Sequence, residues 1–134
     1  MPLLAFGILV WTGAGCAGST GEIEAGLGRE FTLSIGKTAV ILGEGLSIRF
    51  DEVIEDSRCP KDVVCIWEGR VSCVVQVIEG DSTHEMVLTE QGMSDGYATE
   101  TYGEYRIDFH VEPYPEEADD ISQEEYRLLL TVSK

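Results

Sequence analysis

Hydrophobic and polar side chains alternate along most of the chain after residue 29. Successive side chains of a β-strand point to opposite faces, so this period of two predicts strands with one buried and one exposed face. About seven short strands are expected, and glycine-rich or polar turns separate them. The clearest cover residues 31–35, 39–42, 46–51, 71–78, 105–111 and 126–132.

No segment shows a convincing helical period, although residues 116–125 have room for one turn of helix. Many short strands joined by turns are typical of antiparallel two-layer or closed sheets. The pattern therefore predicts an all-β fold, a single antiparallel β-sandwich or barrel. A chain of 134 residues lies within the usual size of one domain.

The charge balance is strongly acidic, with 25 Asp and Glu against nine Lys and Arg and a formal net charge of -16. Nucleic-acid binding draws its affinity from basic groups, so this composition argues against a nucleic-acid partner. An anionic membrane surface would be repelled for the same reason. The charge is explained by solubility, with steering of a cationic partner as the alternative.

The N-terminal segment carries a nine-residue apolar run over residues 3–11, which is too short to span a bilayer. Small residues follow it, as in a secretory signal. The stretch Thr12-Gly13-Ala14-Gly15-Cys16 resembles the lipobox of bacterial lipoproteins, although Gly13 stands where that family usually has Leu. The resemblance implies cleavage before Cys16 and a lipid on its thiol. A plain cleaved signal and a buried N-terminal segment are the alternatives.

These features divide the chain into three parts. We expect a signal peptide over residues 1–15, a flexible tether over 16–28 and a β-sandwich domain over 29–134. The Gly and Ser content of the second part favours the tether. We therefore expect the protein in the cell envelope, anchored to the membrane through the lipid on Cys16 and facing an oxidising compartment.

Two cysteines, Cys59 and Cys65, lie in the least regular stretch of the chain, over residues 56–69. In an exported protein they are expected to form a disulfide, since their separation and Pro60 allow a small closed ring. Trp67 would then share a strand face with Cys65 and cover the disulfide. Cys73 falls on an inward strand position and is expected to be a buried thiol. A pairing of Cys73 with either loop cysteine stays open.

The loop motif Asp-Ser-Arg-Cys-Pro, followed by Val64, Cys65, Trp67 and Gly69, is similar to that of a family of small exported bacterial β-domains of unknown function. The likeness continues into residues 105–115 and 126–132. It implies the fold and the location, and it implies no activity.

Other chemistry is not supported by spacing. The Cys-x5-Cys spacing fits neither paired zinc ligands nor a redox motif, and His84 and His110 are expected singly on outer strand faces. The acidic residues 116–120 do not match a calcium loop. Tyr114, between two prolines, is interpreted as a lid on the core or as a surface recognition residue. No metal, cofactor or catalytic constellation is expected.

The sequence thus predicts a lipid-anchored extracytoplasmic domain that binds an unknown protein or envelope partner and is not an enzyme. A non-catalytic structural accessory domain is the first alternative. A metal-dependent or hydrolytic enzyme that uses acidic loop residues is the second.

Overall fold

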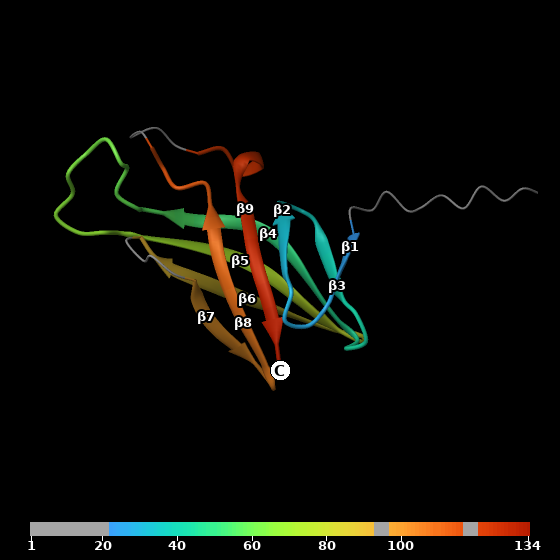
Figure 1. Ribbon diagram of the computed structural model, residues 1–134. Helices are drawn as coiled ribbons and strands as arrows, with labels where there is room; N and C mark the ends of the chain where they lie inside the picture. Colours follow the sequence, from blue (N-terminus) through green and yellow to red (C-terminus); the bar gives the residue numbers. More distant parts are fainter. Residues whose placement is uncertain (1–21, 93–96, 117–120) are drawn as a thin grey trace, which may run out of the picture.

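Two β-sheets stack face to face in a computed structural model that describes residues 22–92, 97–116 and 121–134 (Figure 1). The larger sheet has the order β1-β3-β4-β5-β6, and the smaller has the order β2-β9-β8-β7. The larger sheet consists of β1 (Glu22–Ala25), β3 (Thr38–Ile41), β4 (Leu46–Asp56), β5 (Arg70–Glu79) and β6 (Ser82–Gln91). The smaller sheet consists of β2 (Glu30–Ser34), β9 (Arg127–Ser133), β8 (Tyr105–Glu112) and β7 (Ala98–Tyr102).

This architecture confirms the predicted all-β class as an open sandwich. Every strand pair is antiparallel except β1 with β3, which run parallel. A 3-10 turn, Gln123–Glu125, falls within the stretch expected to hold one helical turn. Within the described residues, no helix is long and apolar enough to cross a membrane.

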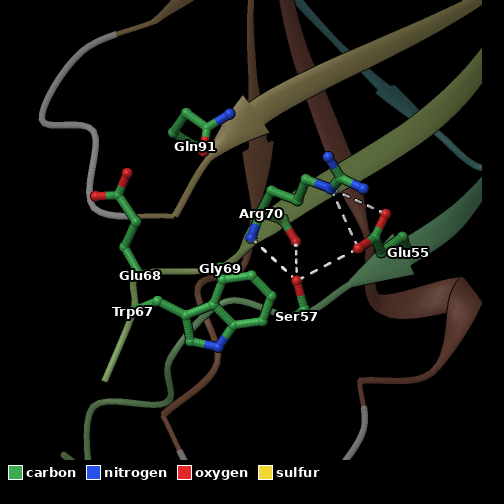
Figure 2. A pocket seen from close by; sticks show the side chains of 7 residues that line it. All are labelled: Glu55, Ser57, Trp67, Glu68, Gly69, Arg70 and Gln91. Carbon is green, nitrogen blue, oxygen red and sulfur yellow. Dashed lines mark hydrogen bonds and ion pairs between the residues drawn. The ribbon is translucent and has the colours of Figure 1, made fainter. Parts of the chain in front are cut away.

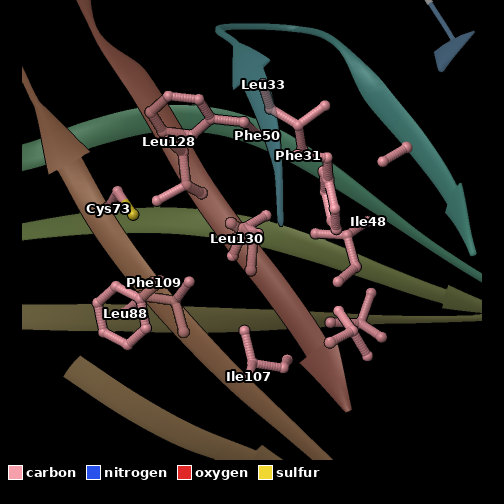
Figure 3. Close-up of a cluster of buried hydrophobic side chains, with 14 of the residues drawn as sticks. Phe31, Leu33, Ile48, Phe50, Cys73, Leu88, Ile107, Phe109, Leu128 and Leu130 are labelled. Carbon is pink, nitrogen blue, oxygen red and sulfur yellow. The ribbon is translucent and has the colours of Figure 1, made fainter. Parts of the chain in front are cut away.

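The core lies between the sheets and is built from the inward side chains of the alternating strands (Figure 3). Phe50 of β4 and Phe109 of β8 are the largest of the fully buried side chains. Others shown there are Phe31, Leu33, Ile48, Leu88, Ile107, Leu128 and Leu130, together with Cys73. Burial of this apolar surface is the main force that holds the sheets together.

Three strands were not predicted. β6 buries only Leu88 and Glu90 among its ten residues, so its sequence lacks an apolar face. β7 has no fully buried residue. β1 pairs with β3 inside the stretch expected to be a tether, and Leu27 packs against the core. The expected tether is therefore wrong for residues 22–28, while residues 16–21 lie outside the described residues.

The two ends of β4 differ in structure. Leu46 at its start pairs with Glu79 of β5, and glycine-containing turns close that end of the sheet. Toward Asp56, β4 has two register shifts against β5. The side chain of Gln123 satisfies the backbone there, because it accepts from the N–H of Val53 and donates to its carbonyl, both at 2.9 Å. The strand then leads into the long connection to β5.

Candidate binding loop

The connection between β4 and β5, residues 57–69, is called here the cysteine loop. It extends beyond the ends of both strands, at the opposite end of the sheet from the turn between β5 and β6 (Figure 1). Cys59 and Cys65 form a disulfide across a Cα–Cα distance of 5.9 Å, as predicted. The disulfide closes the outer part of the loop into a small ring and is typical of proteins in oxidising compartments.

Cys73 takes no part in this bond. Its thiol is buried on β5, in agreement with the prediction. Burial, followed by the nearby charge of Glu90, raises the pKa of the thiol to about 12. A thiol that is neutral and shielded from solvent is unreactive.

The loop is fixed at its base by Arg58, whose side chain is only 1% exposed. The guanidinium donates from Nε and Nη2 to the carboxylate of Asp56, at 2.9 and 2.8 Å. It also donates to the carbonyls of Val111 and Pro113, at 3.1 and 2.9 Å. A buried charge requires hydrogen-bonding partners of this kind, because burial of an uncompensated charge costs roughly several kcal/mol of folding free energy. Arg58 thus ties the loop of the larger sheet to the end of β8 in the smaller one.

Asp56 receives a further hydrogen bond, from the hydroxyl of Tyr126 at 2.7 Å. Burial acts to raise the pKa of this carboxyl, but the hydrogen bonds from Arg58 and Tyr126 and the charge of Arg58 outweigh it. The pKa of Asp56 is therefore lowered. The carboxylate stays ionised at neutral pH and holds Arg58 in place.

Tyr114 supports the loop from the segment that follows β8. Its half-buried hydroxyl donates to the carbonyl of Cys59 at 2.6 Å, and its ring lies beside the cations of Arg58 and Lys61. Two backbone bonds run alongside, from Lys61 N to the carbonyl of Pro115 and from Asp62 N to that of Glu116. These contacts place Tyr114 under the loop, and a recognition role for it stays a prediction.

Two glycines allow close backbone contacts at the loop: Gly69 where its two arms meet, and Gly92, which follows β6, where that segment meets the loop. Gly69 has a φ of +68°, and a Cβ built on it would lie 1.8 Å from the carbonyl oxygen of Ser57. At Gly92 a Cβ would lie 2.2 Å from the carbonyl oxygen of Glu68. No other residue therefore fits at either position without a shift of the backbone.

Large apolar side chains are exposed at the outer end of the loop, and this group is called here the loop tip. It consists of Val63, Val64, Ile66 and Trp67. Val64 and Ile66 are fully exposed, and Trp67 is 75% exposed. The prediction that Trp67 shares a strand face with Cys65 is wrong, because β5 begins only at Arg70 and residues 66 and 67 lie in irregular backbone.

A pocket of about 380 Å³ lies beside the indole of Trp67 (Figure 2). The other residues that line the pocket are mostly charged or polar: Glu55, Ser57, Glu68, Gly69, Arg70 and Gln91. Arg70 is paired with Glu55 at 3.2 Å, and the two arms of the loop are joined by a hydrogen bond from Arg70 N to the Ser57 hydroxyl at 3.1 Å. A second hollow lies at the ring of residues that the Cys59–Cys65 disulfide closes. It is lined by residues 59 and 63–68.

A buried carboxylate, that of Glu90 on the edge strand β6 of the larger sheet, is not predicted by the sequence pattern. Glu90 on β6 is 3% exposed and contacts Nδ1 of His110 at 2.9 Å. Burial raises the pKa of Glu90, although His110 acts in the opposite direction. The ring of Tyr97 stacks on His110. The period of two does not predict this pair. His110 occupies an outward, polar position of β8, and Glu90 occupies an inward position of β6, where an apolar residue would be expected.

Two candidate residues from the sequence remain, Cys16 and His84. Cys16, the predicted lipid site, lies outside the described residues. His84 is exposed on β6, as expected, and its ring lies near that of Tyr102. In the described part of the chain, no group of three or more His, Cys, Asp or Glu side chains is placed to hold a metal ion.

No family model, curated protein or solved structure matches this chain. The resemblance of the loop motif to an exported bacterial family therefore stays a prediction.

Proposed function

We propose that this protein is a lipid-anchored extracytoplasmic binding module, and that the cysteine loop is the surface with which it contacts a partner. The observation that carries the proposal is the exposed loop tip. Val64, Ile66 and Trp67 are held in solvent on a loop that a disulfide closes and a buried arginine fixes.

An exposed apolar cluster on a fixed scaffold favours binding over a passive role. Contiguous apolar side chains on a protein surface usually mark an interaction site. Trp is enriched among the residues that dominate binding energy. Because the loop is already ordered by its base, little conformational entropy would be lost on binding.

The location rests on sequence and on the disulfide together. The apolar run and the stretch before Cys16 support export and lipid attachment, and the Cys59–Cys65 bond fits an oxidising compartment. Labelled palmitate should enter the wild-type chain and not Cys16→Ala. Label in the variant would contradict the anchor.

The binding surface is tested by photo-cross-linking in intact cells of the source organism. A photoreactive residue replaces Val64 in one variant and Leu42 in another. Both positions are exposed and apolar, but Leu42 lies in the turn that precedes β4, at the opposite end of that strand from the loop. We expect a discrete adduct from position 64 and none from position 42.

An equal adduct pattern from both positions, or none from either, would contradict a contact surface at the loop. The structural accessory role would then be the better explanation. A catalytic activity that survives removal of the loop tip would instead favour an enzyme.

A further inference from the structure

The loop tip differs in charge from the rest of the chain. The chain has a formal net charge of -16, yet residues 63–67 contain no ionisable group, because the thiol of Cys65 is held in the disulfide. An apolar surface thus stands in the negative field of a strongly acidic domain. A partner that matches both features must be apolar and positively charged at once. This inference rests on the loop being the binding surface.

The charges nearest to the tip favour the same partner. Of the basic groups near the tip, Arg58 is buried. Lys61 is paired with Glu116 at 3.9 Å, and Arg70 is paired with Glu55 at 3.2 Å. The acidic side chains of Asp62 and Glu68 have no ion-pair partner within the ranges that the structure describes. A cation that approaches the tip therefore meets two uncompensated carboxylates.

Trp67 offers a third contact for a cation. The exposed indole and Glu68 line both the pocket of Figure 2 and the second hollow, at the disulfide-closed ring. The face of an indole attracts Lys and Arg side chains more strongly than other aromatic rings do. The indole thus offers a basic side chain a cation–π contact, and the adjacent residue, Glu68, offers a carboxylate for a second basic side chain.

We propose that the cysteine loop binds a cationic, amphipathic polypeptide segment. Its apolar side chains pack on Val64, Ile66 and Trp67, and its Lys or Arg side chains face Asp62, Glu68 and the indole. An anionic membrane does not fit, since the net charge of the domain repels it. An uncharged apolar ligand would leave the two carboxylates without a role.

The proposal is tested with the fluorescence of Trp67. The chain contains two tryptophans, Trp11 and Trp67. Cleavage before Cys16 would remove Trp11, and Trp11→Phe leaves the loop indole as the only reporter where the N-terminal segment is retained. The probes are a short amphipathic peptide of Leu and Lys and its counterparts with Gln or Glu in place of every Lys. Phosphatidylcholine vesicles test the membrane alternative.

We expect a saturable blue shift with the Lys peptide and an affinity about tenfold higher than for the Gln peptide, from two exposed ion pairs and one cation–π contact. The difference should shrink between about 0.1 M and 1 M salt, as screening shortens the reach of the charges. Asp62→Asn combined with Glu68→Gln should lower the affinity for the Lys peptide to that for the Gln peptide.

Ile66→Asp should abolish the shift, whereas Leu42→Asp, an equal change at an exposed apolar site outside the loop, should leave it intact. Equal affinity for all three peptides would overturn the charge preference and leave the loop as a binding surface. A shift with vesicles alone would overturn the proposal in favour of a membrane, and no shift with any probe would also overturn it. The cross-linking result at position 64 is independent of these outcomes.

Discussion

The base and the tip of the cysteine loop reverse the usual distribution of polar and apolar groups. At the base, the charged side chain of Arg58 is buried and hydrogen-bonded to Asp56 and to two backbone carbonyls. At the tip, a few residues away, Val64 and Ile66 are fully exposed. Charged residues are rarely buried unless paired, while clustered exposed apolar side chains usually have a role outside the fold.

The difference separates two tasks. The base sets the position of the loop relative to both sheets, through contacts that remove nearly all its freedom. The tip contributes little to the fold, and its exposed apolar surface is the one that we propose contacts a partner. Changes at the base should therefore alter stability, and changes at the tip should alter binding alone.

The largest effect is expected from Arg58→Ala, which removes the guanidinium from Asp56 and from the two backbone carbonyls, while Asp56 keeps the hydrogen bond from Tyr126. Loss of one partner of a buried ion pair should lower the free energy of unfolding by about 3–5 kcal/mol, measured by urea denaturation. Arg49→Ala is the matched control. Arg49 also binds an aspartate two residues away, Asp51 at 2.7 Å, but it lies at the surface. It should cost about 1 kcal/mol or less, and equal losses would refute the special role of the base.

The next effect is expected from Gly69→Ala. The added Cβ would meet the carbonyl oxygen of Ser57 in a backbone conformation that disfavours any side chain. We expect a loss of about 3 kcal/mol or more in the free energy of unfolding. At Gly103, also with positive φ, nothing lies within 4 Å of the Cβ position. Gly103→Ala should therefore cost only about 1–2 kcal/mol, and thermal denaturation of the pair isolates the contact with Ser57.

The disulfide should contribute about 2 kcal/mol by restricting the unfolded chain. The double variant Cys59→Ser with Cys65→Ser should lose this amount, and reduction of the wild type should produce the same loss. Mass spectrometry after reduction and native alkylation should find label on Cys59 and Cys65 and none on buried Cys73. Label on Cys73 in the folded protein would contradict its burial.

Acid should weaken the base of the loop. The pKa of Asp56 is lowered in the folded protein, so its contribution is fully present above its unfolded pKa of about 3.9 and is lost as the pH falls through the folded pKa. Each unit of lowering corresponds to about 1.4 kcal/mol. The unfolding free energies of wild type and Asp56→Asn should therefore converge below about pH 4. A constant difference would assign the stabilisation to another group.

The smallest effect on stability is expected at the tip. Ile66→Ala should change the free energy of unfolding by no more than about 0.5 kcal/mol, as is usual for exposed positions. Ile48→Ala, the same change in the core, should cost about 2–5 kcal/mol. Ile66→Ala should nevertheless weaken peptide binding in the fluorescence titration. A large stability loss at Ile66 would show that the tip belongs to the fold.

The alternating strands and the disulfide could be predicted because their signals are local. Phe50, Cys73 and Phe109 lie at inward positions of a period of two, and each is buried as expected. The strands that escaped prediction have weak or absent apolar faces. β6 is an edge strand with one buried apolar residue, Leu88, and β1 owes its place to pairing with β3.

The candidate site could be located but not interpreted from sequence. The motif around Cys59 marked the loop, yet the hydrogen bonds that fix Arg58 reach residues 53 and 55 positions away. No local pattern reveals such partners. Strand periodicity does not predict the exposure of Trp67, because the backbone at residues 66 and 67 is irregular.

The cysteine loop is attached to both sheets of the sandwich, which determines how it would respond to a pulling force. Its arms continue β4 and β5 of the larger sheet, while Arg58, Lys61 and Asp62 bond to the chain beyond β8 of the smaller one. A pull exerted by a bound partner on the tip would therefore be divided between both sheets. Neighbouring strands that are attached at one end only separate one hydrogen bond at a time, whereas this arrangement requires several bonds to break together. On the proposed function, the cysteine loop would thus transmit tension from a bound partner into both sheets.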